Sequence, residues 1–245
     1  MLNRWFPSLV FVLGLLAVLA TNTLPEPPQF AQPESAHAAL AAKQAAALPA
    51  SFVWSDLPRP TPSAHAATLA EVLPGDAAVA ATAGQGPAPV QLIAAWFGGS
   101  REGAADVSLY QSEWRADASW SPAHEIMTRQ KAERELGRNI RKLGNPLIVT
   151  EPGRLHLFFV SVSYGGWAGS AINRSQSTDG GKNWQPAQRI VTSPFFNLST
   201  LVRNQGAWLT DGSLGLPVYH EFVNKHGEWL RLNPEGRVLA KERMP

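Results

Sequence analysis

Two copies of one short segment constrain the fold of this chain more than any other sequence feature. The segment Trp120–Ile126 (WSPAHEI) matches Trp184–Ile190 (WQPAQRI) at four positions, and each copy follows a run of alternating polar and apolar residues. A second pair, Pro152–Leu157 and Asp211–Leu216, joins a tight-turn sequence to a strand pattern with Leu on alternate positions. Recurrence at roughly sixty residues is typical of an array of equivalent units, close to one propeller blade of ~40–50 residues plus an insertion.

Short strand-like runs, broken by Gly, Pro, Asn and Asp, fill the chain from about His65 onward. Many short strands at even spacing indicate a sandwich, a barrel or a propeller, and the repeat favours the propeller. We therefore expect an all-β fold. The expected strands are Gln91–Phe97, Asp106–Trp114, Leu147–Thr150, Leu155–Ser163, Ala171–Ser175, Gln188–Val191, Ser199–Asn204, Ala207–Leu209, Leu214–Glu221, Glu228–Leu232 and Arg237–Arg243.

One basic segment, Arg129–Gly144, has the spacing of a helix. Leu136, Ile140 and Leu143 recur at helical intervals within it. The simpler interpretation is a solvated helical insertion packed by these three residues. The alternative is that its cations, Arg134, Arg138, Arg141 or Lys142, contact an acidic sugar.

The N-terminal residues predict export. Met1–Arg4 carries one positive charge, and Trp5–Ala20 is almost wholly apolar but shorter than the ~20 residues of a spanning helix. We assign residues 1–22 to a signal peptide or membrane anchor and residues 23–64, rich in Ala and Pro, to a flexible linker. The expected location is periplasmic, extracellular or anchored to the membrane.

Composition excludes several kinds of chemistry. The chain has no cysteine, so disulfides, thiolate metal sites and a Cys nucleophile are excluded. The six histidines are scattered and form no His-x-x-x-His pair, so we expect no metal and no cofactor. A formal charge of +2 does not indicate nucleic acid as a partner. No protein partner is identifiable, and an acidic carbohydrate is permitted.

The segment Ser177–Trp184 (STDGGKNW) fits the pattern Ser-x-Asp-x-Gly-x-x-Trp. Asp179 can accept backbone hydrogen bonds in a hairpin turn, Gly181 tolerates positive φ, and Trp184 can pack over the hairpin. The pattern resembles the Asp-box of sialidases and related BNR-repeat propellers. In that family the box lies on the outer side of the blades, which implies structural roles for Ser177, Asp179, Gly181 and Trp184.

The resemblance to sialidase-like proteins extends over about residues 65–245. Ala94–Val107 (AAWFGGSREGAADV) looks like their first-blade segment, and Gly144–Pro146, Gly165–Trp167 and Tyr219–Glu221 are also similar to segments of the group. The resemblance implies a partial sialidase-type β-propeller of about three or four of six four-stranded blades. Six blades need about 300 residues at the usual repeat size, so the chain looks truncated or completed by a partner.

Sialidase chemistry, as the resemblance implies it, uses a Tyr nucleophile assisted by a Glu, an acid for the leaving group and arginines for the sugar carboxylate. Arg101, with Glu102 beside it, is the candidate substrate contact, and Asp106 or Glu102 is the candidate acid. Tyr219 and Glu221, two apart on one strand face, are the candidate nucleophile and its partner.

Each candidate also has an ordinary structural interpretation. Arg101 can pair with Glu102 or Asp106 at a blade rim, Asp106 can cap a turn, and Tyr219 can be a core residue with Glu221 at the rim. His65 has a weaker claim, because a lone His is usually a structural donor. The second and third arginines of a carboxylate clamp cannot be placed.

Two functional hypotheses therefore remain open. The first is an exported exo-α-sialidase-like glycoside hydrolase acting on sialic acid or another acidic sugar of a glycan or polysaccharide. The second is a noncatalytic carbohydrate-binding or assembly propeller. Released sugar separates the first from the second.

Overall fold

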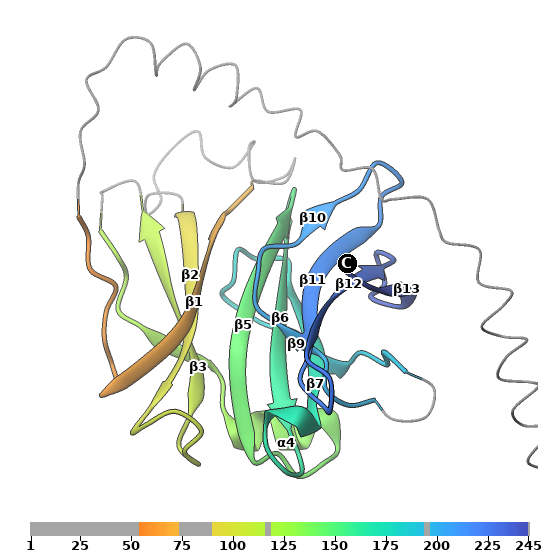
Figure 1. Cartoon of the computed structure of the whole chain (residues 1–245). Helices are drawn as coiled ribbons and strands as arrows, with labels where there is room; N and C mark the ends of the chain where they lie inside the picture. Colours follow the sequence, from red (N-terminus) through yellow and green to blue (C-terminus); the bar gives the residue numbers. More distant parts are fainter. Residues whose placement is uncertain (1–53, 74–89, 116–118, 194–196, 245) are drawn as a thin grey trace, which may run out of the picture. The chain divides into compact units, whose positions relative to one another are not determined.

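Antiparallel strands dominate the computed structural model, which describes residues 54–73, 90–115, 119–193 and 197–244. All of these residues lie within one unit, Ala31–Pro245. The strands form three sheets, which Figure 1 shows in orange and yellow, in green, and in blue. The all-β prediction is confirmed.

Each sheet is built from strands that follow one another in the chain. The first sheet has the order β1 (Ser63–Glu71), β2 (Val90–Gly99), β3 (Ser108–Arg115) and β4 (His124–Met127). The second has the order β5 (Lys142–Glu151), β6 (Arg154–Val162), β7 (Ser170–Ser177) and β8 (Gln188–Arg189). In the third, β9 (Leu201–Val202) and β10 (Ala207–Trp208) both pair with β11 (Leu214–His220), followed by β12 (His226–Leu232) and β13 (Val238–Arg243).

The sequence repeat corresponds to equivalent places in these sheets. Each copy begins in the connection after the third strand of a sheet, at Trp120 or Trp184, and runs into the fourth strand, β4 or β8. The second repeated segment begins at the turn between β5 and β6 and recurs at the turn between β10 and β11. Repeated four-stranded meanders are the blades of a propeller, so the predicted partial β-propeller is confirmed.

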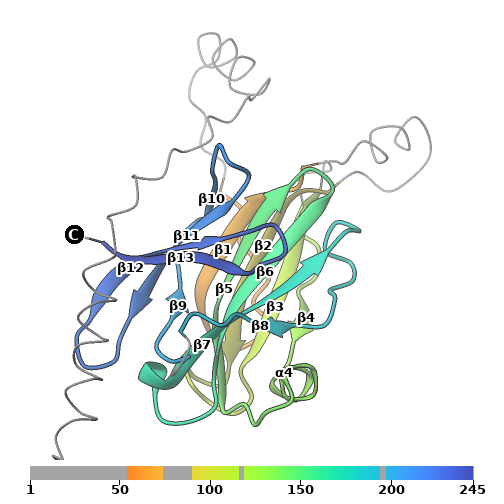
Figure 2. The same ribbon diagram turned by 90° about the vertical axis from the view of Figure 1, so that its right-hand side faces the viewer.

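The second sheet contributes to two hydrophobic cores. On β6, Leu157 and Phe159 belong to the core shared with the first sheet, whereas Phe158 and Val160 belong to the core shared with the third. All four side chains are fully buried. Successive strand residues point to opposite faces, so a strand buried on both sides needs an almost continuous apolar run. Figure 2 shows the same sheets turned by 90°.

The turn at Ser177–Trp184 is held by its own polar side chains. Asp179 accepts hydrogen bonds from the Asn183 backbone N–H (2.9 Å), the Asn183 amide (2.7 Å) and the Ser177 hydroxyl (2.7 Å). Burial alone would raise the pKa of Asp179, but these hydrogen bonds hold it below its ordinary value. The turn therefore stays closed around an ionised carboxylate.

Gln111 on β3 joins this turn to the first sheet. Its side-chain oxygen accepts from the Trp184 indole N–H (2.9 Å), and its side-chain nitrogen donates to the Gly181 carbonyl (3.1 Å). A Cβ at residue 181 would lie 2.7 Å from Ile93 and 2.9 Å from Gln111, at a φ of +89°. Only glycine fits this close approach without strain. The turn after β7 thus connects the first and second sheets.

The predicted helical insertion is wrong in its second half. α4 covers only Arg129–Leu136, capped by the Thr128 hydroxyl and ended by Gly137 at a φ of +62°. Strand β5 begins at Lys142, because Leu143 pairs with Ser161 and is buried in the core between the first and second sheets. Another short helix among the described residues is η1 (Trp167–Gly169).

The expected boundaries at the N-terminal side are tested only in part. β1 begins at Ser63, just inside the predicted linker, and was not among the strands predicted from alternation. The predicted signal peptide and most of the linker lie outside the described residues. No helix in the described ranges is long and apolar enough to cross a membrane.

A buried histidine links the second sheet to the third. His156 is only 1% exposed; its Nε2 lies 3.0 Å from Glu151 Oε1, and its Nδ1 lies 2.9 Å from Arg174 Nη2. Arg174 also donates to the Pro234 carbonyl in the turn after β12 (2.7 Å). Since Nδ1 faces a guanidinium donor, the neutral imidazole with its proton on Nε2 satisfies all partners.

This network predicts that acid weakens the fold. Burial, followed by the charge of Arg174, lowers the pKa of His156 despite its bond to Glu151. Below the ordinary histidine pKa of about 6.5, the unfolded chain therefore binds a proton that the folded chain resists, so the free energy of unfolding decreases as the pH falls. Urea unfolding at about pH 7.5 and 5.5 measures this loss.

The control for this prediction is a second histidine variant. We expect His156→Gln to flatten the pH dependence, whereas His124→Gln, at an exposed position of β4, keeps it. An unchanged pH dependence in His156→Gln would place the acid sensitivity elsewhere.

Candidate active site

A cavity of about 340 Å³ brings together residues that are far apart in the sequence. Its lining comes from all three sheets and from the loops that follow β2, β6, β9 and β11. The lining residues are His65, Ala66, Phe97, Glu102, Asn145, Trp167, Arg203, Tyr219 and Glu221. Its size falls within the ~300–1,000 Å³ typical of small-molecule sites.

The first strands of the three sheets are β1, β5 and β9. β5 contacts both β1 and β9, and the strand pairing is irregular where these strands reach the cavity. The register of β1 shifts after His65, and that of β5 shifts after Gly144. In the third sheet the inner edge is interrupted between β9 and β10. Such irregularities turn side chains out of the regular alternation. His65, Asn145 and Arg203 lie at these three irregularities, and all three line the cavity.

Tyr219 is a half-buried polar residue of the cavity. Its hydroxyl oxygen accepts a hydrogen bond from the Asn145 side-chain amide (3.2 Å). Burial raises the pKa of Tyr219; the Asn145 bond and the Arg203 charge oppose this rise, and the Glu221 and Glu102 charges add to it. The net direction is upward, so the phenol is neutral at neutral pH and needs a base to act as a nucleophile.

Ser199 positions the segment that carries Glu221. Its buried hydroxyl accepts hydrogen bonds from the backbone N–H groups of Glu221 (2.6 Å) and Phe222 (2.8 Å). Ser199 lies two residues before β9 and has a positive φ of 58°. A strained residue kept in place by two hydrogen bonds indicates that the start of this loop is fixed.

Aromatic rings form much of the wall. Trp167 packs against Gly144, where a Cβ would lie 2.8 Å from the indole. Lys142 Nζ lies 5.6 Å from the same ring. His65 stacks on Phe97 with ring centroids 5.4 Å apart. These rings stand beside the polar side chains of the cavity, and aromatic rings next to convergent polar groups are found in sites for small ligands.

The structure separates the predicted site residues into two groups. Glu102, Tyr219 and Glu221 line the cavity, whereas Arg101 and Asp106 are not among its lining residues. Asp106 accepts hydrogen bonds from the Ser100 backbone N–H and hydroxyl, both at 3.0 Å. These bonds, with a smaller effect of the Arg101 charge, lower the pKa of Asp106. A carboxylate that stays ionised is a poor proton donor, so its turn-capping interpretation fits this geometry better.

Arg203 is not among the site residues that the sequence predicts. The sequence predicts one strand over Ser199–Asn204, whereas the pairing with β11 ends at Val202 and resumes at Ala207. The available signal was the polar run Arg203–Gln205 between two apolar pairs. Gln205, in the same interruption, donates to the Leu69 carbonyl on β1 (2.9 Å), which ties this loop to the first sheet.

Replacing Asn145 with glycine is expected to raise the pKa of Tyr219 further, because the amide donor that stabilises the phenolate is lost. Glycine suits the positive φ of 45° at this position, so the substitution adds no backbone strain. The chain has three tyrosines, and ultraviolet titration with a Tyr219→Phe reference isolates this one. An unchanged Tyr219 titration would contradict the contact.

The described residues contain no group of three or more His, Asp or Glu side chains arranged to hold a metal ion.

Several solved structures resemble the chain at low identity. A family 117 glycoside hydrolase from the marine bacterium Zobellia galactanivorans has 10% identity and a TM-score of 0.48, over 73% of this chain and 60% of that one. The α-L-arabinanase of Penicillium chrysogenum has 13% identity and a TM-score of 0.46, over 73% of this chain and 49% of that one. The sialidase of Trypanosoma rangeli has 11% identity and a TM-score of 0.43, over 75% of this chain and 30% of that one. The chain thus spans 60% or less of each.

Comparison with curated proteins gives no match. A family model does match: the BNR repeat-like domain aligns with residues 90–245, more than half of the chain. This stretch runs from β2 to the C-terminal residue and includes Ser177–Trp184 and most of the cavity lining. The chain therefore belongs to the BNR repeat-like family of sialidase-like β-propellers.

Proposed function

We propose that this protein is an exported glycoside hydrolase that removes sialic acid or another acidic sugar from a glycan. The observation that carries the proposal is the meeting of Tyr219, Glu221, Glu102 and Arg203 in one cavity. A nucleophile, two carboxylates and a cation are the groups that hydrolysis of an acidic glycoside requires. The N-terminal residues 1–22 are the proposed export signal or membrane anchor.

Arg203 is the proposed contact for the sugar carboxylate. A guanidinium presents paired N–H donors that match a carboxylate, and its charge does not depend on pH. No ion pair joins Arg203 to another described residue, so its charge is available to a ligand. This residue takes the role that the sequence resemblance gave to Arg101.

The proposed reaction proceeds in two steps. Glu221 accepts the Tyr219 proton while the phenolic oxygen bonds to the anomeric carbon; the glycosidic bond breaks, and its oxygen takes a proton from Glu102. Water then attacks the anomeric carbon, giving its proton to Glu102 and releasing Tyr219, which recovers its proton from Glu221. The cavity thus favours Glu102 over Asp106 as the proton donor.

A panel of fluorogenic glycosides tests the proposal on the full chain. We expect release from an acidic sugar, such as sialic, glucuronic or galacturonic acid, and about 10–100-fold lower kcat/KM in Arg203→Met, because charge-assisted hydrogen bonds contribute about 1.5–3 kcal/mol. Arg237→Met, at an exposed position, is the matched control. Retention of an acidic glycan without any release would instead support the noncatalytic carbohydrate-binding module.

A further inference from the structure

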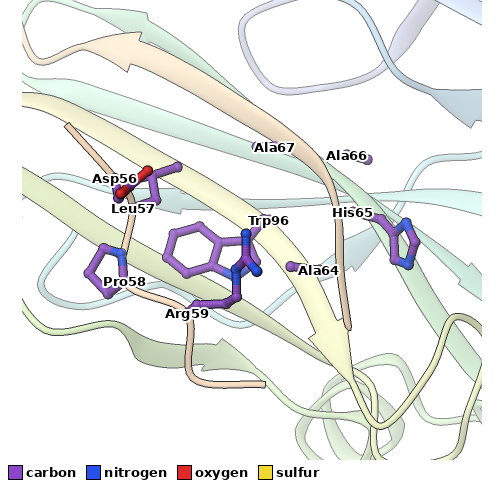
Figure 3. Close-up of a pocket in the computed structure, with 9 residues that line it drawn as sticks. All are labelled: Asp56, Leu57, Pro58, Arg59, Ala64, His65, Ala66, Ala67 and Trp96. Carbon is purple, nitrogen blue, oxygen red and sulfur yellow. The ribbon is translucent and has the colours of Figure 1, made fainter. Parts of the chain in front are cut away.

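A second cavity adjoins the candidate active site. It has a volume of about 640 Å³, nearly twice that of the first, and the two share His65 and Ala66 in their linings. We call the first the inner cavity and this one the outer cavity. The outer cavity lies between the segment 54–60 and strands β1 and β2 (Figure 3). Its lining is Asp56, Leu57, Pro58, Arg59, Ala64, His65, Ala66, Ala67 and Trp96.

The boundary between the two cavities is the irregular part of β1. Ala66 has a positive φ of 48°, and the pairing of β1 with β2 is interrupted between His65 and Thr68. The His65 ring is held there by the Ser63 hydroxyl, 2.8 Å from Nε2, and by stacking on Phe97. Its Nδ1 has no hydrogen bond to a described residue. A ligand that extends from one cavity into the other therefore passes a fixed polar ring.

The outer cavity presents a balanced pair of charges. Asp56 and Arg59 both line it, as Figure 3 shows, and neither forms a hydrogen bond or ion pair with another described residue. A carboxylate accepts and a guanidinium donates hydrogen bonds. Sugar hydroxyls do both, whereas a second acidic sugar would meet the Asp56 carboxylate. Leu57, Pro58 and the Trp96 ring add apolar wall, as in most carbohydrate-sized pockets.

We propose that the two cavities together bind a glycan of at least two sugar units, with a neutral sugar in the outer cavity. This inference rests on the proposed function, which places the acidic, reacting sugar beside Tyr219 and Arg203. The adjoining unit, on the leaving-group side, then lies against Arg59 and Asp56. The preferred substrate is an acidic sugar linked to a neutral one rather than an acidic homopolymer.

The test compares an acidic sugar with the same sugar joined to neutral units, by calorimetric titration of the full chain carrying Glu221→Gln, so that the glycan is not cleaved during the titration. The probes are sialic acid with sialyllactose, and glucuronic acid with glucuronosyl-xylose. We expect at least tenfold tighter binding of the longer member of one pair, the effect of one charge-assisted hydrogen bond. Arg59→Ala is expected to remove most of that gain. Arg237→Ala, at an exposed position, is the matched control.

The outcomes separate this inference from the proposed function. Equal affinity within both pairs, or full affinity for the longer glycan in Arg59→Ala, overturns the outer cavity as a binding site even if a reporter glycoside is hydrolysed. A length-dependent gain that needs Arg59, without hydrolysis of any glycoside, supports the outer cavity and overturns the enzymatic function. Absence of binding to every probe overturns both.

Discussion

Replacing Glu221 with glutamine is expected to lower kcat on the acidic reporter glycoside by about 10²–10⁴-fold, the usual contribution of a positioned acid or base. The raised pKa of Tyr219 keeps the phenol protonated, so the reaction depends on a base to remove its proton. Glutamine has nearly the same shape and keeps the backbone bonds to Ser199 intact. Steady-state kinetics on the purified variant measures the effect.

Tyr219→Phe is expected to cause a loss of similar size, and the double variant should be no slower than the slower single variant, because the two residues act in one step. Two surface variants are matched controls: Glu235→Gln and Tyr164→Phe alter exposed residues. Full activity in either Glu221→Gln or Tyr219→Phe would remove that residue from the mechanism.

Replacing Gln111 with leucine is expected to cause the largest loss of stability. The change leaves the Trp184 indole N–H and the Gly181 carbonyl without their partner. Leaving the buried Gly181 carbonyl unpaired costs about 1–3 kcal/mol, and losing the hydrogen bond of the partly buried Trp184 indole costs about 0.5–1.5 kcal/mol, so the free energy of unfolding should fall by about 1.5–4.5 kcal/mol. Urea unfolding measures the change.

A double-mutant cycle separates this bond from general packing. In the Trp184→Phe background the indole donor is already gone, so Gln111→Leu should cost less than it does in the native chain. Equal costs in both backgrounds would mean that the hydrogen bond does not join the two sheets.

The sequence predicted strands best where alternation and burial agree. Leu155–Ser163 differs from β6 by one residue at each end, because its apolar residues serve two cores and admit no other arrangement. Prediction failed after α4, where Leu136, Ile140 and Leu143 suit a helix as well as a loop followed by a strand. The pairing of β5 with β6 decides between these, and that pairing is not local.

The candidate site was predictable only where it follows strand geometry. Tyr219 and Glu221 are two residues apart at the end of β11 and both line the cavity. Arg203 was not predictable in this way, because its position depends on the break between β9 and β10, which both pair with β11. The family resemblance implies an acid role for Asp106, but its hydrogen bonds to Ser100 are formed within one loop outside the cavity lining.

A crystal structure of Glu221→Gln with a bound, uncleaved acidic glycoside examines the inner cavity most directly. We predict that the sugar carboxylate lies within hydrogen-bond distance of the Arg203 guanidinium and that the anomeric carbon lies next to the Tyr219 hydroxyl. A glycan bound at full occupancy elsewhere on the protein, with the inner cavity holding only water, would contradict the proposed active site.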